Sequence, residues 1–328
     1  MKFFRYLTIA TLCTNASIAA AHHSEAAYNH DVTTAFDGVV TEIGWRNPHV
    51  YVFVETTGEN GEEVLWKLET GSTPVMARSG WTRDSLVVGD FISVLTHPEI
   101  RTENKVGILL SIEKEDGSIL AQVDNLAQPE IAATGFSGVW KKPYTDDSPF
   151  TSNLQNLALT EAGKAAQDAY DRDRDSPLSR CIGFPAPFLV NTGTYLFEIE
   201  LLDDRMMIYS EYLDSHRTIH LDGRDHPENG ERTTQGHSIG NWEDDVLVVD
   251  TRLFSDHRTP NRNGVPSGEQ KHVTERYRLS DDKTRMLIDV FMEDPEYLTE
   301  TFEGSASHQY APNLERHEYN CTPAGLSG

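Results

Sequence analysis

The feature that most constrains this chain is a strand-like pattern that recurs along most of its length. From Phe36 onward, apolar residues alternate with polar ones or form short β-branched runs, and Gly, Asn, Asp and Pro separate the runs. Alternation with a period of two places one face of each strand against a core and the other toward water. The sequence therefore predicts an all-β chain in which helix is a minor element.

The strand-like runs fall into two groups. Residues 36–122 hold five short runs and one helical turn near 74–78, a pattern that suits a small OB-like Greek-key barrel. The second group has eight runs joined by polar turns and favours a closed, lipocalin-like antiparallel β-barrel, whose interior holds side chains or one small ligand. Its runs are TYLFEIEL, DRMMIYSEYL, RTIHLDG, DDVLVVDTRLF, KHVTERYRL, TRMLIDVFME, YLTETFEG and LERHEYNC.

The first residues are typical of a secretory signal peptide, which we place at residues 1–21. Lys2 and Arg5 give a positive start, an apolar run follows, and three alanines at 19–21 are small enough for a signal peptidase. The mature protein is therefore expected in the periplasm or outside the cell. No later run reaches the ~20 apolar residues of a spanning helix, so no membrane span is predicted.

The mature chain divides into two domains and a linker. We assign residues 22–127 to the OB-like domain, residues 128–136 to a polar linker and residues 137–325 to the lipocalin-like domain. A short helical insertion is expected near residues 160–170, because TEAGKAAQDAY is rich in helix formers and Thr160 is placed to act as the N-cap.

The charge of the chain limits its partners. Removing the signal peptide removes two of the 28 basic residues and none of the 52 acidic ones, so the net charge moves from −24 to 26 − 52 = −26. An acidic surface of this kind repels phosphate backbones, and nucleic-acid binding is disfavoured. The expected partner is a small apolar organic molecule, with metal cations as an alternative. The sequence leaves the oligomeric state open.

Two cysteines, Cys181 and Cys321, remain after the signal peptide is removed. In an oxidising compartment two such residues most simply form a disulfide bond. Closing a loop of about 140 residues stabilises a fold by roughly 3 to 5 kcal/mol in the chain-entropy model. A thiolate metal ligand or nucleophile is the alternative, but it lacks a CxxC spacing and an evident activating partner.

Longer strings in both halves resemble two-domain exported bacterial proteins of unknown function. This resemblance supports the two-domain organisation and implies no activity. In the N-terminal half the strings are HHS after Ala21, WRNPHVYV and SGWTRDSLVVGD; in the C-terminal half they are LDGRDHPE, GHSIGNWEDDVLVVDT and HVTERY. Separately, the Gly138-Val139-Trp140 sequence with Arg316 on the last strand resembles lipocalin-like barrels, in which such a tryptophan closes one end beneath a basic side chain.

The histidines at the signal-peptide junction suggest a copper site. Cleavage after Ala21 makes His22 the N-terminus, whose amine and ring chelate a metal together; cleavage one residue earlier gives an Ala-His-His terminus in which His23 is in the chelating position. His49 is the best third ligand, because it shares a strand face with Tyr51 and Phe53. Copper is thus a possible cofactor, although none is certain; His216 and His220 share a strand face and offer a possible zinc pair, for which a plain surface face is the favoured interpretation. The alternative is a solvated N-terminus whose histidines bind nothing.

Polar residues within the strands of the second barrel suggest acid–base chemistry. If these side chains point into an otherwise apolar cavity, burial raises the pKa of a carboxyl group into the range that general acid–base catalysis needs. We predict an isomerase, lyase or hydratase type of reaction without a redox cofactor. The catalytic candidates are His237, Asp250, Glu211 and His272, and the ligand-contacting candidates are Tyr212, Trp242 and Glu275.

Two plainer interpretations compete with these. Half of every strand of an antiparallel barrel faces water, so each carboxylate also fits the wet face. The chain also fits a non-catalytic module that docks on an envelope partner. The GHSIG string resembles a hydrolase nucleophile elbow, but it leads into a strand rather than a helix, so a serine hydrolase is disfavoured.

Overall fold

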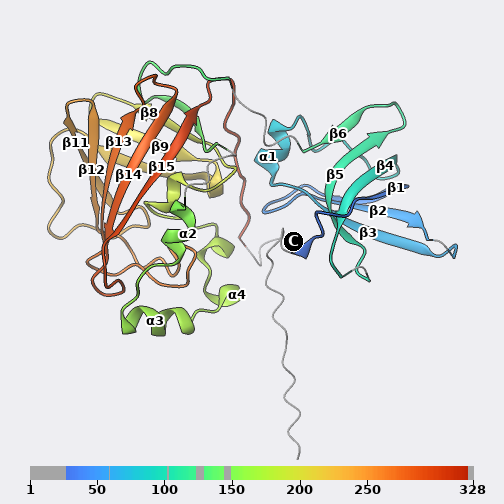
Figure 1. The fold of residues 1–328 in the computed structure, drawn as a ribbon, viewed down its shortest axis with the longest axis horizontal. Coiled ribbons are helices and arrows are strands. Elements are labelled where there is room, and N and C mark those ends of the chain that lie inside the picture. The colour runs from blue at the N-terminus through green and yellow to red at the C-terminus, as the bar shows by residue number, and fades with distance from the viewer. Residues whose placement is uncertain (1–26, 59, 102, 123–128, 144–148, 324–328) are drawn as a thin grey trace, which may run out of the picture.

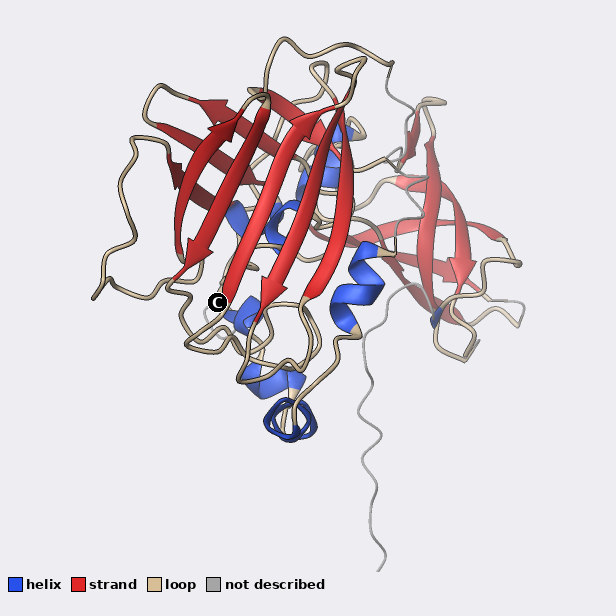
Figure 2. Cartoon of the chain, turned by 60° about the vertical axis from the view of Figure 1, so that its left-hand side comes forward, coloured by secondary structure: helices blue, strands red, loops and turns tan. Residues whose placement is uncertain are grey.

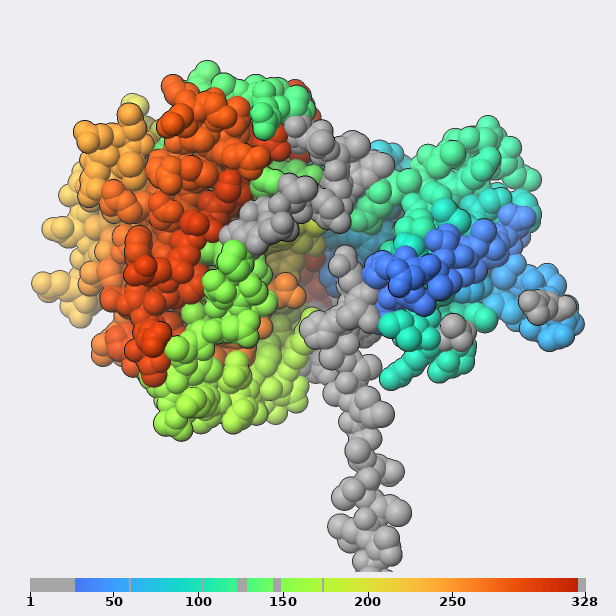
Figure 3. All heavy atoms as spheres, viewed as in Figure 1, coloured from blue at the N-terminus to red at the C-terminus, as the bar shows by residue number. Residues whose placement is uncertain are grey.

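The computed structural model describes residues 27–58, 60–101, 103–122, 129–143 and 149–323. It contains two closed β-barrels, a small one followed by a large one, which confirms the all-β prediction. Figure 1 shows the two barrels side by side, and Figure 3 shows them as two distinct lobes. No helix among the described residues is long and apolar enough to cross a membrane.

The first barrel closes through a parallel pair of strands. Its sheet order is β3-β2-β1-β4-β5-β6, and the additional pairing of β3 with β5 closes the first five strands into a Greek-key barrel, with β6 paired to the outside of β5. Inward-facing valines at 40, 52 and 54 are fully buried in its core. Its elements are β1 (Thr34–Gly44), β2 (Tyr51–Thr57), β3 (Glu63–Glu69), α1 (Thr73–Arg78), β4 (Phe91–Pro98), β5 (Val106–Lys114) and β6 (Ile119–Ala121).

The second barrel has nine strands in the order β10-β11-β12-β13-β14-β15-β7-β8-β9. All neighbouring pairs are antiparallel except β10 with β11, which is parallel. Its strands are β7 (Gly138–Lys141), β8 (Phe197–Leu201), β9 (Arg205–Ser210), β10 (Ser215–His220), β11 (His237–Glu243), β12 (Val246–Arg252), β13 (His272–Leu279), β14 (Arg285–Glu293) and β15 (Phe302–Tyr310).

Helices lie toward one end of the large barrel (Figure 2). Residues 183–191 are buried throughout, and their carbonyl groups accept hydrogen bonds from Gln235 and Lys271, which precede β11 and β13. The chain itself therefore closes this end. The helices are α2 (Phe150–Gln155), α3 (Glu161–Asp168) and α4 (Arg172–Asp175), and Thr160 caps α3 as predicted, accepting a hydrogen bond from the Gly163 amide.

Three strand predictions in the large barrel are wrong. HSIGNWE was expected to precede a strand but forms β11, and the run predicted to begin at Tyr297 begins at Phe302 and extends to Tyr310. LERHEYNC is not a strand, so Arg316 lies in an irregular segment. There its guanidinium group contacts the Glu198 carboxylate and the Tyr209 ring. These local patterns failed because the available strand partner, not the alternation, decides where pairing occurs.

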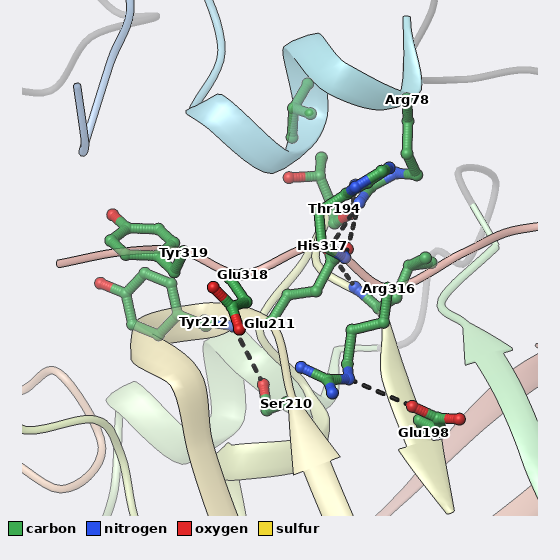
Figure 4. A network of polar contacts seen from close by, with 12 residues as sticks. Arg78, Thr194, Glu198, Ser210, Glu211, Tyr212, Arg316, His317, Glu318 and Tyr319 are labelled. Carbon is green, nitrogen blue, oxygen red and sulfur yellow. Dashed lines mark hydrogen bonds and ion pairs between the residues drawn. The ribbon is translucent and has the colours of Figure 1, made fainter. Parts of the chain in front are cut away.

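The irregular C-terminal segment passes between the two barrels (Figure 4). The predicted disulfide between Cys181 and Cys321 is confirmed and fastens this segment to the large barrel. The Tyr319 amide donates to Asp214, and the Tyr319 carbonyl accepts a hydrogen bond from Asn47 of the small barrel. Residues 316–321 therefore contact both barrels.

Candidate functional site

Asp250 lies at the centre of a group of histidines on the wall of the large barrel. His272 on β13 places its Nε2 atom 2.6 Å from Asp250 Oδ2, and His226, in the loop before β11, places its Nε2 atom 2.7 Å from Oδ1. Arg252 Nε lies 3.1 Å from Oδ1. One carboxylate therefore orients two imidazole rings from different parts of the chain.

The protonation state of Asp250 fixes the form of both rings. Burial raises the pKa of this carboxyl group, but hydrogen bonds from His272, Arg252 and His226 outweigh burial and hold the pKa well below its usual range. The ionised carboxylate only accepts hydrogen bonds, so each imidazole donates its Nε2–H to it. In a neutral ring the Nδ1 atom then carries the free lone pair.

A surface hollow lies beside His272. Its volume is about 260 Å³, and it is lined by His272, Thr274, Phe291, Glu293 and Thr301. The Nδ1 atom of His272 is 3.8 Å from the Glu293 carboxylate, so it lies on the side of the ring that faces this lining. The Phe291 ring adds an apolar contact, because 37% of its surface is exposed. The hollow thus combines an oriented base, two hydroxyl groups and an aromatic face.

His226 links this group to two further histidines. Its Nδ1 atom lies 2.9 Å from Nδ1 of His237, at the start of β11. The ring of His237 stacks on that of His220, at the end of β10, with centroids 5.2 Å apart. Burial, and then the neighbouring histidines, lower the pKa of His237, which keeps its ring neutral near pH 7. The parallel pairing of β10 with β11 places the last two rings side by side.

Three predicted catalytic residues, His237, Asp250 and His272, are therefore close together, but they lie on the outer face of the barrel. On β12, Leu247, Val249 and Thr251 are buried while Asp250 is partly exposed. These side chains therefore do not point into the interior, and Asp250 agrees with the plainer interpretation that strand carboxylates lie on the water-facing side. The strands place apolar residues on both faces, so alternation alone did not show which face is the inner one.

Glu211, the fourth predicted catalytic residue, is in a different place. It lies in a turn after β9 and its carboxylate accepts hydrogen bonds from Arg78 of the small barrel, one of them 2.6 Å long, and from the Leu196 and His317 amides (Figure 4). Its side chain is fully buried. Glu211 thus holds the barrels together, and the structure does not bring it to the histidine group.

The three predicted ligand-contacting residues are also separated. Tyr212 packs against Tyr195 and Tyr319, and burial raises the pKa of its hydroxyl group to about 12. Trp242 is 46% exposed and contacts the Phe136 ring. Glu275 is the one whose side chain points into the large barrel. These residues do not form a common binding site.

A buried polar group surrounds Glu275. Arg217 places its Nη2 atom 2.6 Å from the Glu275 carboxylate and 2.7 Å from Thr251 Oγ1, and the Tyr277 hydroxyl donates to the same carboxylate at 3.0 Å. Arg217 and Glu275 are essentially inaccessible to solvent. The barrel interior at this level is therefore filled by a paired charge.

Of the predicted copper ligands, the structure describes only His49; His22 and His23 lie outside the described residues. His49 Nδ1 is 2.9 Å from the Thr70 carbonyl oxygen and 3.3 Å from Glu69 Oε1. A ring that donates Nδ1–H to a carbonyl leaves Nε2 available to a metal. The copper site stays a prediction.

Comparisons with known proteins give a family match for the N-terminal part alone. Residues 10–109 match a family described as "Family of unknown function (DUF6152)". This agrees with the resemblance noted for the N-terminal half, and the large barrel lies outside the match. No match was found among curated proteins.

Solved structures similar to this chain include the fluorescent protein UnaG. The wild-type crystal structure has 17% sequence identity and a TM-score of 0.28, covering 54% of this chain and 97% of that chain. A mutant of the same protein has 18% identity and a TM-score of 0.28, covering 54% of this chain and 96% of that chain.

The sequence did not single out two residues of this region: His226 of the histidine group and Phe291 of the hollow. His226 belongs to an irregular loop and precedes Asp250 by 24 positions. Phe291 occupies an outward position of β14, where an exposed aromatic ring looks like any other strand residue. No local pattern marks either residue, because their positions depend on pairing between distant segments.

Proposed function

We propose that the large barrel binds a small, uncharged organic molecule in the hollow beside His272 and converts it by acid–base chemistry without a redox cofactor. The observation that carries this proposal is the 2.6 Å hydrogen bond from His272 Nε2 to Asp250, which turns the other nitrogen of the ring toward the lining of the hollow. A carboxylate that orients an imidazole is a recurring arrangement for a general base.

The contacts of His272 favour proton abstraction from a carbon next to a carbonyl group. In the first step a C–H bond breaks and an N–H bond forms at Nδ1, leaving an enolate. The imidazolium then lies between the Asp250 and Glu293 carboxylates, which stabilise its charge. In the second step the proton returns to a carbon, and the net result is an isomerisation.

The lining of the hollow selects the class of substrate. Glu293 and the strongly acidic chain repel anions, whereas the Phe291 ring favours an apolar or unsaturated body. The Thr274 hydroxyl group lines the hollow and can donate to a carbonyl oxygen, whereas that of Thr301 donates to Glu293 at 3.4 Å. These features support a small neutral ketone or enone.

Exchange of the α-hydrogens of cyclohexanone in D₂O, followed by proton NMR, tests this proposal. We expect H272Q to slow the protein-catalysed exchange by about 10²-fold or more, the usual contribution of a general base. D250N is expected to slow it as well, because an amide no longer holds the Nε2–H form of the ring.

The matched control is H216Q, which changes an exposed histidine on β10 of the same barrel. It should leave the exchange rate unchanged. The proposal is wrong if H272Q and D250N both exchange cyclohexanone at the wild-type rate, or if the wild type does not exceed a buffer blank.

A second candidate function, copper binding by His22, His23 and His49, is supported by the surroundings of His49. Tyr28 donates a hydrogen bond to Glu69, and Glu69 contacts His49, so the beginning of the described chain lies beside this ring. His23 precedes Tyr28 by five positions, and five residue steps of extended chain span roughly 17 Å.

The copper candidate is tested by comparing mature protein that has its natural N-terminus with a variant that carries one extra residue before His22. We expect the affinity for copper(II) in a calorimetric titration to fall by at least about tenfold, because the amine can no longer share a chelate ring with the His22 side chain. Replacing His49 by alanine should also weaken binding. An undiminished affinity in both variants would rule out this ligand set.

A further inference from the structure

We propose a second metal site, for copper(II), between His226 and His237 on the outer wall of the large barrel. The two Nδ1 atoms face each other at 2.9 Å across the junction between the loop that follows β10 and the start of β11. This site is separate from the copper candidate at His49, and it does not depend on His272 being a catalytic base.

Asp250 prepares His226 for this role. The ring donates Nε2–H to Asp250 Oδ1 at 2.7 Å, so its Nδ1 lone pair points toward His237. Histidines that bind metals usually donate their other ring N–H to a carboxylate or a carbonyl, which fixes the ring and raises its basicity. Asp250 is in turn held by Arg252.

The separation of the two nitrogens fits one particular geometry. Two metal–nitrogen bonds of about 2.05 Å span about 2.9 Å when they meet at a right angle and about 3.3 Å at a tetrahedral angle. A right angle between imidazole ligands is typical of tetragonal copper(II), and imidazole ranks among the ligands that this ion prefers. The separation is short enough for one ion to bind both nitrogens, and the preference of copper(II) for imidazole makes it the ion with which the site is tested.

Without the metal, one of the two nitrogens carries a hydrogen that the other accepts. Copper takes the place of this shared hydrogen: the proton of the neutral His237 ring moves from Nδ1 to Nε2, and both Nδ1 lone pairs bind the ion. No net proton is released in this exchange.

The site offers two protein ligands. Among the described residues, no group of three or more histidine, cysteine, aspartate or glutamate side chains is arranged to hold a metal ion. His220 stacks on His237 instead of facing the same point. The remaining coordination positions are thus open to water or to a small ligand, and binding is expected to be weaker than at a closed three-histidine site.

Titration of the full-length mature protein with copper(II) sulfate, followed by calorimetry and by electron paramagnetic resonance, tests this inference. Both H226A and H237A should bind one equivalent fewer than the wild type and lose the same axial two-nitrogen signal. D250N should keep the equivalent but weaken it by about 10- to 100-fold, the usual effect of removing a carboxylate behind a ligating histidine.

Two controls separate this site from other sources of copper binding. H216A changes an exposed histidine of the same barrel and should bind like the wild type, whereas H49A should remove only the signal of the candidate site on the small barrel. Wild-type stoichiometry and spectra in both H226A and H237A would overturn the inference. Equal weakening by H216A would mean adventitious binding to surface histidines, and that also overturns it.

Discussion

The free energy of unfolding is expected to fall by about 4 kcal/mol when the pH is lowered from 7 to about 5. The cause is a pair of histidines held in their neutral form. Burial lowers the pKa of His308, inside the large barrel, to about 3, and burial together with the nearby Lys271 lowers that of His257 to about 4. Both side chains are almost inaccessible to solvent.

The direction of this change in stability follows from the number of protons that the folded and unfolded states bind. An unfolded histidine has a pKa of about 6.5 and takes up a proton as the pH falls below that value, whereas the folded rings stay neutral down to their lowered pKa values. The unfolded state therefore binds more protons, and each ring removes about 2 kcal/mol by pH 5. Carboxyl groups with a lowered pKa, such as Asp250, destabilise the fold only below about pH 4, outside this window.

Urea unfolding at several pH values measures this effect. H308F keeps an aromatic ring against Phe197, whose centroid lies 4.7 Å away, and removes the titrating group, so the loss of stability between pH 7 and 5 should shrink by about half. H216A, at an exposed position, should leave the loss unchanged. An identical loss in H308F and the wild type would show that His308 does not stay neutral in the fold.

The R78A variant is expected to lose about 3 to 5 kcal/mol of stability, because it leaves a charge buried without its partner. Arg78 at the end of α1 reaches across to the fully buried Glu211, and its second guanidinium nitrogen donates to the Thr194 carbonyl at 2.9 Å (Figure 4). The two amides that also bind Glu211 cannot replace the lost positive charge.

Denaturant unfolding of R78A, E211Q and the double variant measures this contribution. The double variant should be more stable than R78A, since the glutamine is uncharged and its one carbonyl oxygen still accepts from one of the two amides, Leu196 or His317. R205A is the matched control: Arg205 pairs with Asp204 at the surface, and its loss should cost less than about 1 kcal/mol. If R78A and R205A cost the same, the buried pair does not hold the barrels together.

The R78A variant also shows how strongly the unfolding of one barrel is coupled to the unfolding of the other. The C-terminal segment is tied to the large barrel by the Cys181–Cys321 disulfide and to the small barrel through Asn47. We expect the wild type to unfold in one transition and R78A to show the small barrel unfolding first.

The sequence by itself determined the features that depend on neighbours along the chain. Alternation marked most strands of both barrels, helix formers after Thr160 marked α3, and two cysteines beyond the expected signal peptide marked the disulfide. The strands and α3 follow from short-range rules, a period of two and an N-cap, whereas the disulfide follows from there being only two cysteines beyond the expected signal peptide.

Only the tertiary structure decided which residues meet. Strands such as VLVVDT place apolar side chains on both faces, so the sequence could not show that Asp250 faces outward and Thr251 inward. Nor could it bring His226 to Asp250, or Arg78 to Glu211, which lie 24 and 133 residues apart. Such contacts depend on which strand pairs with which, and pairing is set by the packing of the whole core rather than by any one segment.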